Sequence, residues 1–218
     1  IMVLRLSAGD TLTLFNGLGG EYQARITRID RQRVTTEIVS HSSREAELPY
    51  RITLAQGIPE ATKMDWIIEK AVELGVSDII PLAAQRSVVR LDNDRAEKRL
   101  SRWQAIAISA AQQCGRNRLP HIASPVGTGE YLRQTTPSPR ILFSPRTTET
   151  LSEWARHQKP QNITLLIGPE GGFSPEEENM AEQQGVTFLS MGPRILRTET
   201  AGLAAVAAIN ALWETRPE

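Results

Sequence analysis

The spacing of apolar residues changes about fifty residues into the chain. Before that point, short stretches alternate between apolar and polar residues around polar or glycine-rich turns, which is typical of half-buried strands. We expect strands at 10–15, 21–29 and 33–39, followed by a polar linker at 40–50. The pattern predicts a small β domain over residues 1–48. Three strands are few for a closed barrel, so we expect an N-terminal strand to be missing.

From residue 51 onward, apolar strand-like runs alternate with segments whose apolar residues recur at helical spacing. Strands are predicted at 51–56, 77–84, 121–124, 140–144, 163–167 and 186–191. Helices are predicted at 63–75, 95–113, 128–134, 147–157, 175–184 and 199–213. Strands that alternate with helices favour an α/β domain, residues 51–218, built on a largely parallel sheet covered on both faces.

A glycine-rich loop, "GPEGGF", joins the strand at 163–167 to the next helix. Ser174, Pro175 and Glu177 have the spacing of an N-cap, a first helical position and a capping box. The loop therefore lies at the carboxyl end of a buried strand, where α/β sheets place their ligands. Glycine allows backbone to approach a ligand closely, although the loop is also explained as a tight turn with glycines for geometry alone.

A second Gly-Pro turn follows the strand at 186–191, and the two glycine loops are expected to face each other across one site. Arg194, Arg197 and Glu199 come just before the last helix and would project into that site, unless they form structural salt bridges. That helix is apolar around most of its circumference, so it packs closely against the sheet or against a second subunit.

Composition narrows the possible classes of protein. Hydrophobic residues make up 40% of the 218, which is enough for a core. No apolar run is long enough to cross a membrane, and no signal-peptide pattern is present, although residue 1 is Ile and not Met. The single cysteine, Cys114, excludes an internal disulfide and fits a reducing cytoplasm, where we expect the protein to act. It is expected to be a packing residue and not a nucleophile.

Basic and acidic residues are equal in number, 25 each, so a global field that attracts nucleic acid is not expected. Local arginine clusters remain, and arginine suits phosphate recognition. A solvated helix face explains the cluster within 86–102 equally well, because acidic residues interleave it. The predicted RNA-binding residues are Arg25, Arg28, Arg86, Arg90, Arg116 and Arg118.

Two motifs together, "IGPEGGFSPEE" and "MGPRILRTETA", resemble the paired cofactor loops of the ribosomal RNA small subunit (16S) uracil-N3 methyltransferase family of the SPOUT (trefoil-knotted) superfamily. The segments "KMDWIIEKAVELGV", "RSVVR" and "QQCGRNRLP" occur in the family's order, so the resemblance covers nearly the whole chain. It implies a PUA-like RNA-binding β-barrel, shortened here, before a knotted α/β methyltransferase domain.

The resemblance further implies S-adenosylmethionine as cofactor, 16S ribosomal RNA or the small ribosomal subunit as substrate, and a homodimer. We expect no metal site and no association with a membrane. The cofactor residues that it implies are Ile167, Gly168, Glu170, Gly171, Gly172, Met191, Gly192, Ile195, Leu196, Arg197, Thr198 and Ala201.

Methylation of uracil N3 requires the loss of a proton and the stabilisation of charge on N3, O2 and O4. Arg197 is the expected stabiliser, and Glu170 or Glu199 the expected proton acceptor. Three alternatives stay open: a SPOUT enzyme acting on ribose 2′-O or on transfer RNA, a non-catalytic RNA-binding adaptor, and a nucleotide-phosphate binder. The sequence contains neither of the common phosphate-binding glycine motifs, G-x-x-x-x-G-K-[ST] and G-x-G-x-x-G, which counts against the nucleotide-phosphate binder.

Overall fold

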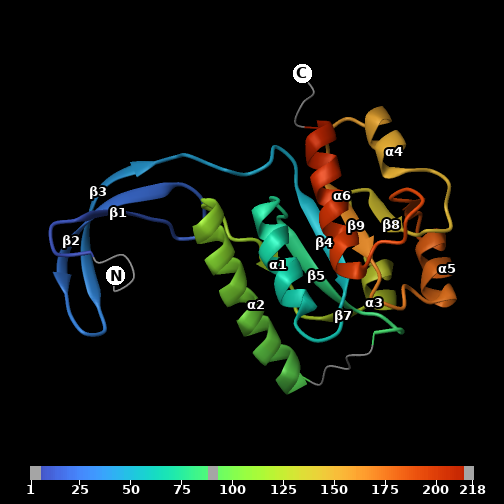
Figure 1. The fold of residues 1–218 in the computed structure, drawn as a ribbon, viewed down its shortest axis with the longest axis horizontal. Coiled ribbons are helices and arrows are strands. Elements are labelled where there is room, and N and C mark those ends of the chain that lie inside the picture. The colour runs from blue at the N-terminus through green and yellow to red at the C-terminus, as the bar shows by residue number, and fades with distance from the viewer. Residues whose placement is uncertain (1–5, 88–92, 214–218) are drawn as a thin grey trace. The chain divides into compact units, whose positions relative to one another are not determined.

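A computed structural model describes residues 6–87 and 93–213, with the side chains of 93–95 left out. The chain divides into two compact units (Figure 1). The first comprises residues 1–47 and 111–119, and the second comprises 48–110 and 120–218. Residues 111–119 fall inside the range assigned to the second domain on sequence, but they pack with the β strands of the first.

The first unit contains a three-stranded antiparallel sheet in the order β1-β2-β3. Its strands are β1 (Thr11–Leu14), β2 (Glu21–Ile29) and β3 (Val34–Ser42). Ala24 and Ile26 of β2 are its buried apolar residues, and register shifts beside each of them bend the ladder. The three predicted strands are confirmed, and the structure shows that they pair antiparallel, while closure into a barrel stays a prediction.

The second unit is built on a parallel sheet in the order β10-β8-β9-β4-β5-β6, with the short strand β7 also paired to β5. Every pairing in it is parallel, as the alternation of strands and helices predicted. The strands are β4 (Ile52–Gly57), β5 (Asp78–Ala83), β6 (His121–Ile122), β7 (Val126–Gly127), β8 (Arg140–Phe143), β9 (Ile163–Ile167) and β10 (Thr187–Leu189).

Helices cover both faces of this sheet. Because neighbouring residues of a strand point to opposite sides, each strand contributes residues to both layers of packing. On β4, Leu54 lies against α6, whereas Ala55 belongs to a cluster with residues of α3 and α5. α6 contacts α1, α4, β4 and β9 (Figure 1). The helices are α1 (Lys63–Glu73), α2 (Asn93–Cys114), α3 (Thr128–Arg133), α4 (Leu151–His157), α5 (Pro175–Gln183) and α6 (Thr198–Trp213).

Local signals account for the starts of α4 and α5 and for the end of α5. The capping box of Ser174 and Glu177 is present at the start of α5, and Gly185 just beyond its end has φ +69. α4 was expected from residue 147 but begins at Leu151, because Thr150 and Glu153 form a second capping box there. The two-residue strand β7 carried too little pattern to be predicted. The implied knot stays a prediction, since strand order and register do not define threading.

Candidate functional site

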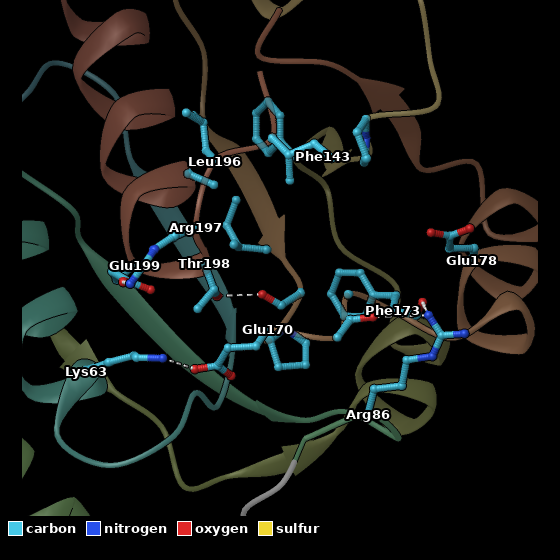
Figure 2. A pocket seen from close by; sticks show the side chains of 18 of the residues that line it. Lys63, Arg86, Phe143, Glu170, Phe173, Glu178, Leu196, Arg197, Thr198 and Glu199 are labelled. Carbon is cyan, nitrogen blue, oxygen red and sulfur yellow. Dashed lines mark hydrogen bonds and ion pairs between the residues drawn. The ribbon is translucent and has the colours of Figure 1, made fainter. Parts of the chain in front are cut away.

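A cavity of about 520 Å³ lies at the carboxyl ends of the parallel strands (Figure 2). This is the edge where parallel α/β sheets bind ligands. Four segments supply most of its wall: the loop after β9, the start of α6, the residues that follow β8, and the N-terminal end of α1. The lining residues from the first two are Ile167, Gly168, Pro169, Glu170, Gly171, Gly172, Phe173, Ile195, Leu196, Arg197, Thr198, Glu199 and Ala201.

The glycine loop after β9 is held by hydrogen bonds to side chains and backbone of neighbouring segments. Glu177 accepts hydrogen bonds from the backbone N–H of Ser174 at 2.8 Å and of Gln85 at 3.0 Å, so the capping box also joins the loop after β5. Arg86 donates to the carbonyls of Gly171 at 3.1 Å and Phe173 at 3.3 Å. The loop is therefore fixed by charge-assisted hydrogen bonds, and Arg86, which supplies two of them, itself lines the cavity.

A buried hydrogen-bond chain connects the two motifs. Thr198, the first residue of α6, donates to the carbonyl oxygen of Gly168 at 2.6 Å. Its Oγ1 accepts from Nε2 of Gln56 on β4 at 2.9 Å, and that nitrogen also reaches the carbonyl of Gly57. The start of α6 and the glycine loop are thus locked together through the central strand.

Thr198→Val is expected to lower the free energy of unfolding by about 1–3 kcal/mol, because a buried carbonyl and amide lose a shared partner without a change of shape. Thr198→Ser should restore most of the loss. Urea unfolding measures the effect, with Thr200→Val as control, because Thr200 is exposed on the same helix. A change below about 0.5 kcal/mol in Thr198→Val would contradict the coupling.

Carboxylates and cations gather at one side of the cavity. Nζ of Lys63 lies 2.6 Å from Oε1 of Glu170, and Arg197 Nη1 lies 3.9 Å from Oε1 of Glu199. Burial pushes the pKa of Glu170 upward, but hydrogen bonds from Lys63 and from backbone N–H groups outweigh it, so the pKa falls below its ordinary value. Glu170 is therefore held as a carboxylate.

The Glu199 carboxylate differs from that of Glu170 in its hydrogen-bond partners. Its Oε2 is buried and has no hydrogen-bond partner among the described residues. A buried acceptor without a partner is costly, and such atoms are found where a ligand or a reaction completes the set. Glu199 thus offers a buried free acceptor at the cavity, whereas the carboxylate of Glu170 is already held through one oxygen by Lys63 and Glu60.

The structure brings most of the predicted cofactor residues together around the cavity. Those that line it are Ile167, Gly168, Glu170, Gly171, Gly172, Ile195, Leu196, Arg197, Thr198 and Ala201. Met191 and Gly192 do not, because the chain between β10 and α6 first meets the cavity at Ile195. Gly192 has φ +92, so the turn itself explains this glycine.

Within the glycine loop, sequence reasoning left out Pro169 and Phe173. Outside it, sequence reasoning missed the lining residues Lys63, Phe143, Pro145, Arg146 and Glu178. Two of these had a usable signal. Lys63 begins the helix after β4, and Phe143 ends β8, so both lie at the carboxyl edge of the same parallel sheet as the glycine loop. Strand order, which sequence does not supply, was needed to know that these strands neighbour β9.

The predicted RNA-binding arginines separate into several environments. Arg86 supports the glycine loop, as described above, which accounts for it without RNA. Arg116 is 4% exposed and forms a bidentate pair with Glu47, at 2.9 and 2.5 Å, inside the first unit. A guanidinium that is buried and engaged in this way has a structural role, so a contact of Arg116 with phosphate stays an untested prediction.

The remaining arginines stay candidates or fall outside the description. Arg118 pairs with Glu45 but remains half exposed. Arg25 and Arg28 are exposed on β2, and Arg28 pairs with Asp30. Arg90 lies outside the described residues.

No helix among the described residues is both long and apolar enough to span a bilayer. Within the same residues, no group of three or more His, Cys, Asp or Glu side chains is arranged to hold a metal ion.

Comparison with known proteins agrees with this geometry. Residues 46–210 match the RNA methyltransferase domain, and residues 2–39 match the RNA methyltransferase PUA domain. The ribosomal RNA small subunit methyltransferase E of Bacillus subtilis is 33% identical over 96% of this chain and 85% of its own.

Solved structures are similar as well. A Legionella pneumophila methyltransferase in complex with SAM superposes with a TM-score of 0.90 at 38% identity, over 96% of this chain and 86% of its own. The Neisseria gonorrhoeae ribosomal RNA small subunit methyltransferase E bound to S-adenosyl methionine gives 0.89 at 38%, over 97% and 87%. The two motif segments line one cavity, and the matches extend over nearly the whole chain. The chain therefore belongs to the RNA methyltransferase family that includes the ribosomal RNA small subunit methyltransferases E.

Proposed function

We propose that this protein transfers a methyl group from S-adenosylmethionine to N3 of one uridine in 16S ribosomal RNA. The observation that carries the proposal is the cavity at the carboxyl edge of the sheet, where the two motif loops meet and Thr198 bonds to Gly168. Membership of the family, and relatives that were solved with this cofactor, support the same conclusion.

The residues around the cavity fit the cofactor. A Cβ on Gly168 would lie 2.9 Å from the backbone of Gly172, whereas a Cβ on Gly172 would meet nothing within 4 Å, so the loop is closed on itself and open toward the cavity. Backbone groups and the apolar side chains of Ile167, Ile195 and Leu196 suit an adenosine, and the carboxylates of Glu170 and Glu199 suit positive charge. When bound, S-adenosylmethionine supplies an electrophilic methyl group on a sulfonium.

The residues of the chain have to prepare uracil N3 for attack. N3 lies on the Watson–Crick edge, so the base must be unpaired before it enters. Its proton must leave, and negative charge develops on O2 and O4. Arg197, whose side chain is 83% exposed at the rim, is placed to stabilise that charge. Glu199, with its free buried oxygen, is the proposed proton acceptor, in preference to Glu170.

The reaction is tested by incubating purified protein with S-adenosylmethionine and 16S ribosomal RNA or small subunits, followed by mass spectrometry of the nucleosides. N3-methyluridine is the expected product. A ribose 2′-O-methylated nucleoside, or methylation of transfer RNA alone, would assign the protein to another SPOUT activity. Binding of the cofactor without any methylated product would favour an RNA-binding adaptor, and calorimetry with ATP tests the nucleotide-phosphate binder.

A homodimer is proposed as the active form. α6 buries one side against the sheet and α1, yet Ala207 and Ala211 remain exposed on it, and Trp66 on α1 is 45% exposed. Apolar helix surface of this kind is typical of an interface between copies. Light scattering should therefore show twice the chain mass at micromolar concentration, and Trp66→Glu should shift the protein toward monomer. A wild-type monomer would contradict the proposal.

RNA contact is proposed for the exposed arginines Arg25, Arg28 and Arg118, and a cytoplasmic location follows from the ribosomal substrate. In a chain with no net charge, such local clusters have to supply the attraction to phosphate.

A further inference from the structure

The turn between β4 and α1 (residues 58–62) contacts the glycine loop through the backbone N–H of Glu60, which donates to Glu170. A Cβ on Gly57, the last residue of β4 just before this turn, would lie 2.5 Å from both N and Cδ of Pro169, so the end of β4 also contacts the loop at the backbone. Ala61 in this turn has φ +52 and is the one non-glycine residue with positive φ in the described part of the chain. Alanine adopts this conformation only when its surroundings impose it, and such residues gather at functional sites.

Glu170 is the loop residue that the turn and the start of α1 contact by hydrogen bonds. One oxygen of its carboxylate accepts both Lys63 Nζ at 2.6 Å and the backbone N–H of Glu60 at 3.1 Å. Figure 2 shows Lys63 and Glu170 pointing toward one another across the edge of the cavity. Both side chains are about one-third exposed, so the contact lies at the rim and not in the core.

We propose that Lys63 is a positioning residue of the methyl-transfer site, which fixes the Glu170 carboxylate and through it the glycine loop 168–172 against the β4–α1 turn. The inference rests on the proposed function for its effect on catalysis, but the contact itself is a property of the ligand-free protein. It gives Glu170 a structural role and leaves proton acceptance to Glu199.

The charges around Lys63 support this role. Its pKa is raised chiefly by the hydrogen bond to Glu170, against the opposing effect of burial, and further by the charges of Glu170, Glu199 and Glu60. Glu170 has a lowered pKa, so the contribution of its charge to the contact is present above its ordinary pKa and is lost as the pH falls through the lowered one. Lys63 has a raised pKa, so its contribution is lost only as the pH rises through that value. The pair is intact from roughly pH 5 to 10.

A double-mutant cycle separates positioning from direct contact with substrate. Lys63→Met and Glu170→Gln should each raise amide hydrogen exchange in residues 168–173 of the ligand-free protein by about threefold to tenfold, and weaken S-adenosylmethionine binding by a similar factor. The double variant should be no worse than the more affected single variant, and Lys63→Arg should restore most of the effect. Lys63→Met should also move the acidic limb of cofactor binding to higher pH, because the lowered pKa of Glu170 rises when the hydrogen bond from Lys63 is lost.

Lys70→Met is the matched control. Lys70 is a lysine of the same helix that pairs with Glu69 and Glu73 and does not line the cavity, so its loss should leave loop exchange and cofactor affinity unchanged. If Lys63→Met does not fold, Lys63→Arg and Glu170→Gln still report on the contact.

Two outcomes would overturn the inference. Unchanged loop exchange in Lys63→Met shows that the ion pair does not hold the loop. Additive losses in the double variant show that Lys63 acts independently of Glu170. By contrast, a wild-type protein that binds no S-adenosylmethionine refutes the proposed function, while loop exchange in the free protein still decides the positioning role.

Discussion

Arg197→Ala is expected to lower kcat for methyl transfer by about 100-fold while leaving the affinity for S-adenosylmethionine within about threefold. The factor is that for the loss of one hydrogen-bond donor to a developing oxyanion. Arg197 is mostly exposed at the cavity rim and its contact with Glu199 is long, at 3.9 Å, so its removal should cost little stability. Single-turnover methylation and calorimetry with the cofactor measure the two quantities.

Arg194→Ala is the control for this experiment, because Arg194 is exposed in the same segment but does not line the cavity. It should retain wild-type kcat. An Arg197→Ala variant with normal turnover would exclude Arg197 from charge stabilisation. A loss confined to cofactor binding would place it in the cofactor pocket alone.

Arg116→Met is expected to destabilise the first unit by about 3 kcal/mol. Removing one partner of a buried pair leaves the other charge poorly compensated, and Glu47 is only 20% exposed. Hydrogen exchange of residues 111–119 and urea unfolding report the loss. Arg118→Met, which breaks the half-exposed pair with Glu45, should cost less than about 1 kcal/mol and serves as the matched control.

The same two variants test whether Arg116 or Arg118 of the segment "CGRNRLP" contacts RNA phosphate. Arg118→Met should lower the salt slope of RNA binding by about one unit if Arg118 contacts a phosphate. Arg116→Met, under conditions where it remains folded, should leave the slope unchanged. A stable Arg116→Met protein with a reduced slope would restore the role that the sequence first suggested for Arg116.

The sequence by itself determined the elements and the position of the site along the chain. Apolar period and turn residues located β9 and the helix after it, and Ser174, Pro175 and Glu177 set the start of α5 because capping is a local interaction. The two motifs identified the segments that line the cavity, although only the first brings its glycines to it, where backbone must approach closely. Short elements such as β7 were lost because two residues carry no period.

What only the tertiary structure decided is which charges meet. The segment "CGRNRLP" has no acidic neighbours along the chain. Folding brings it Glu47, which pairs with Arg116, and Glu45, which pairs with Arg118, from about seventy residues earlier. Lys63 likewise precedes Glu170 by 107 residues, and Gln56 precedes Thr198 by 142. The spacing of hydrophobic residues is a local property of the sequence. An ion pair between distant residues depends on which strands become neighbours, and that order is set by the packing of the whole sheet.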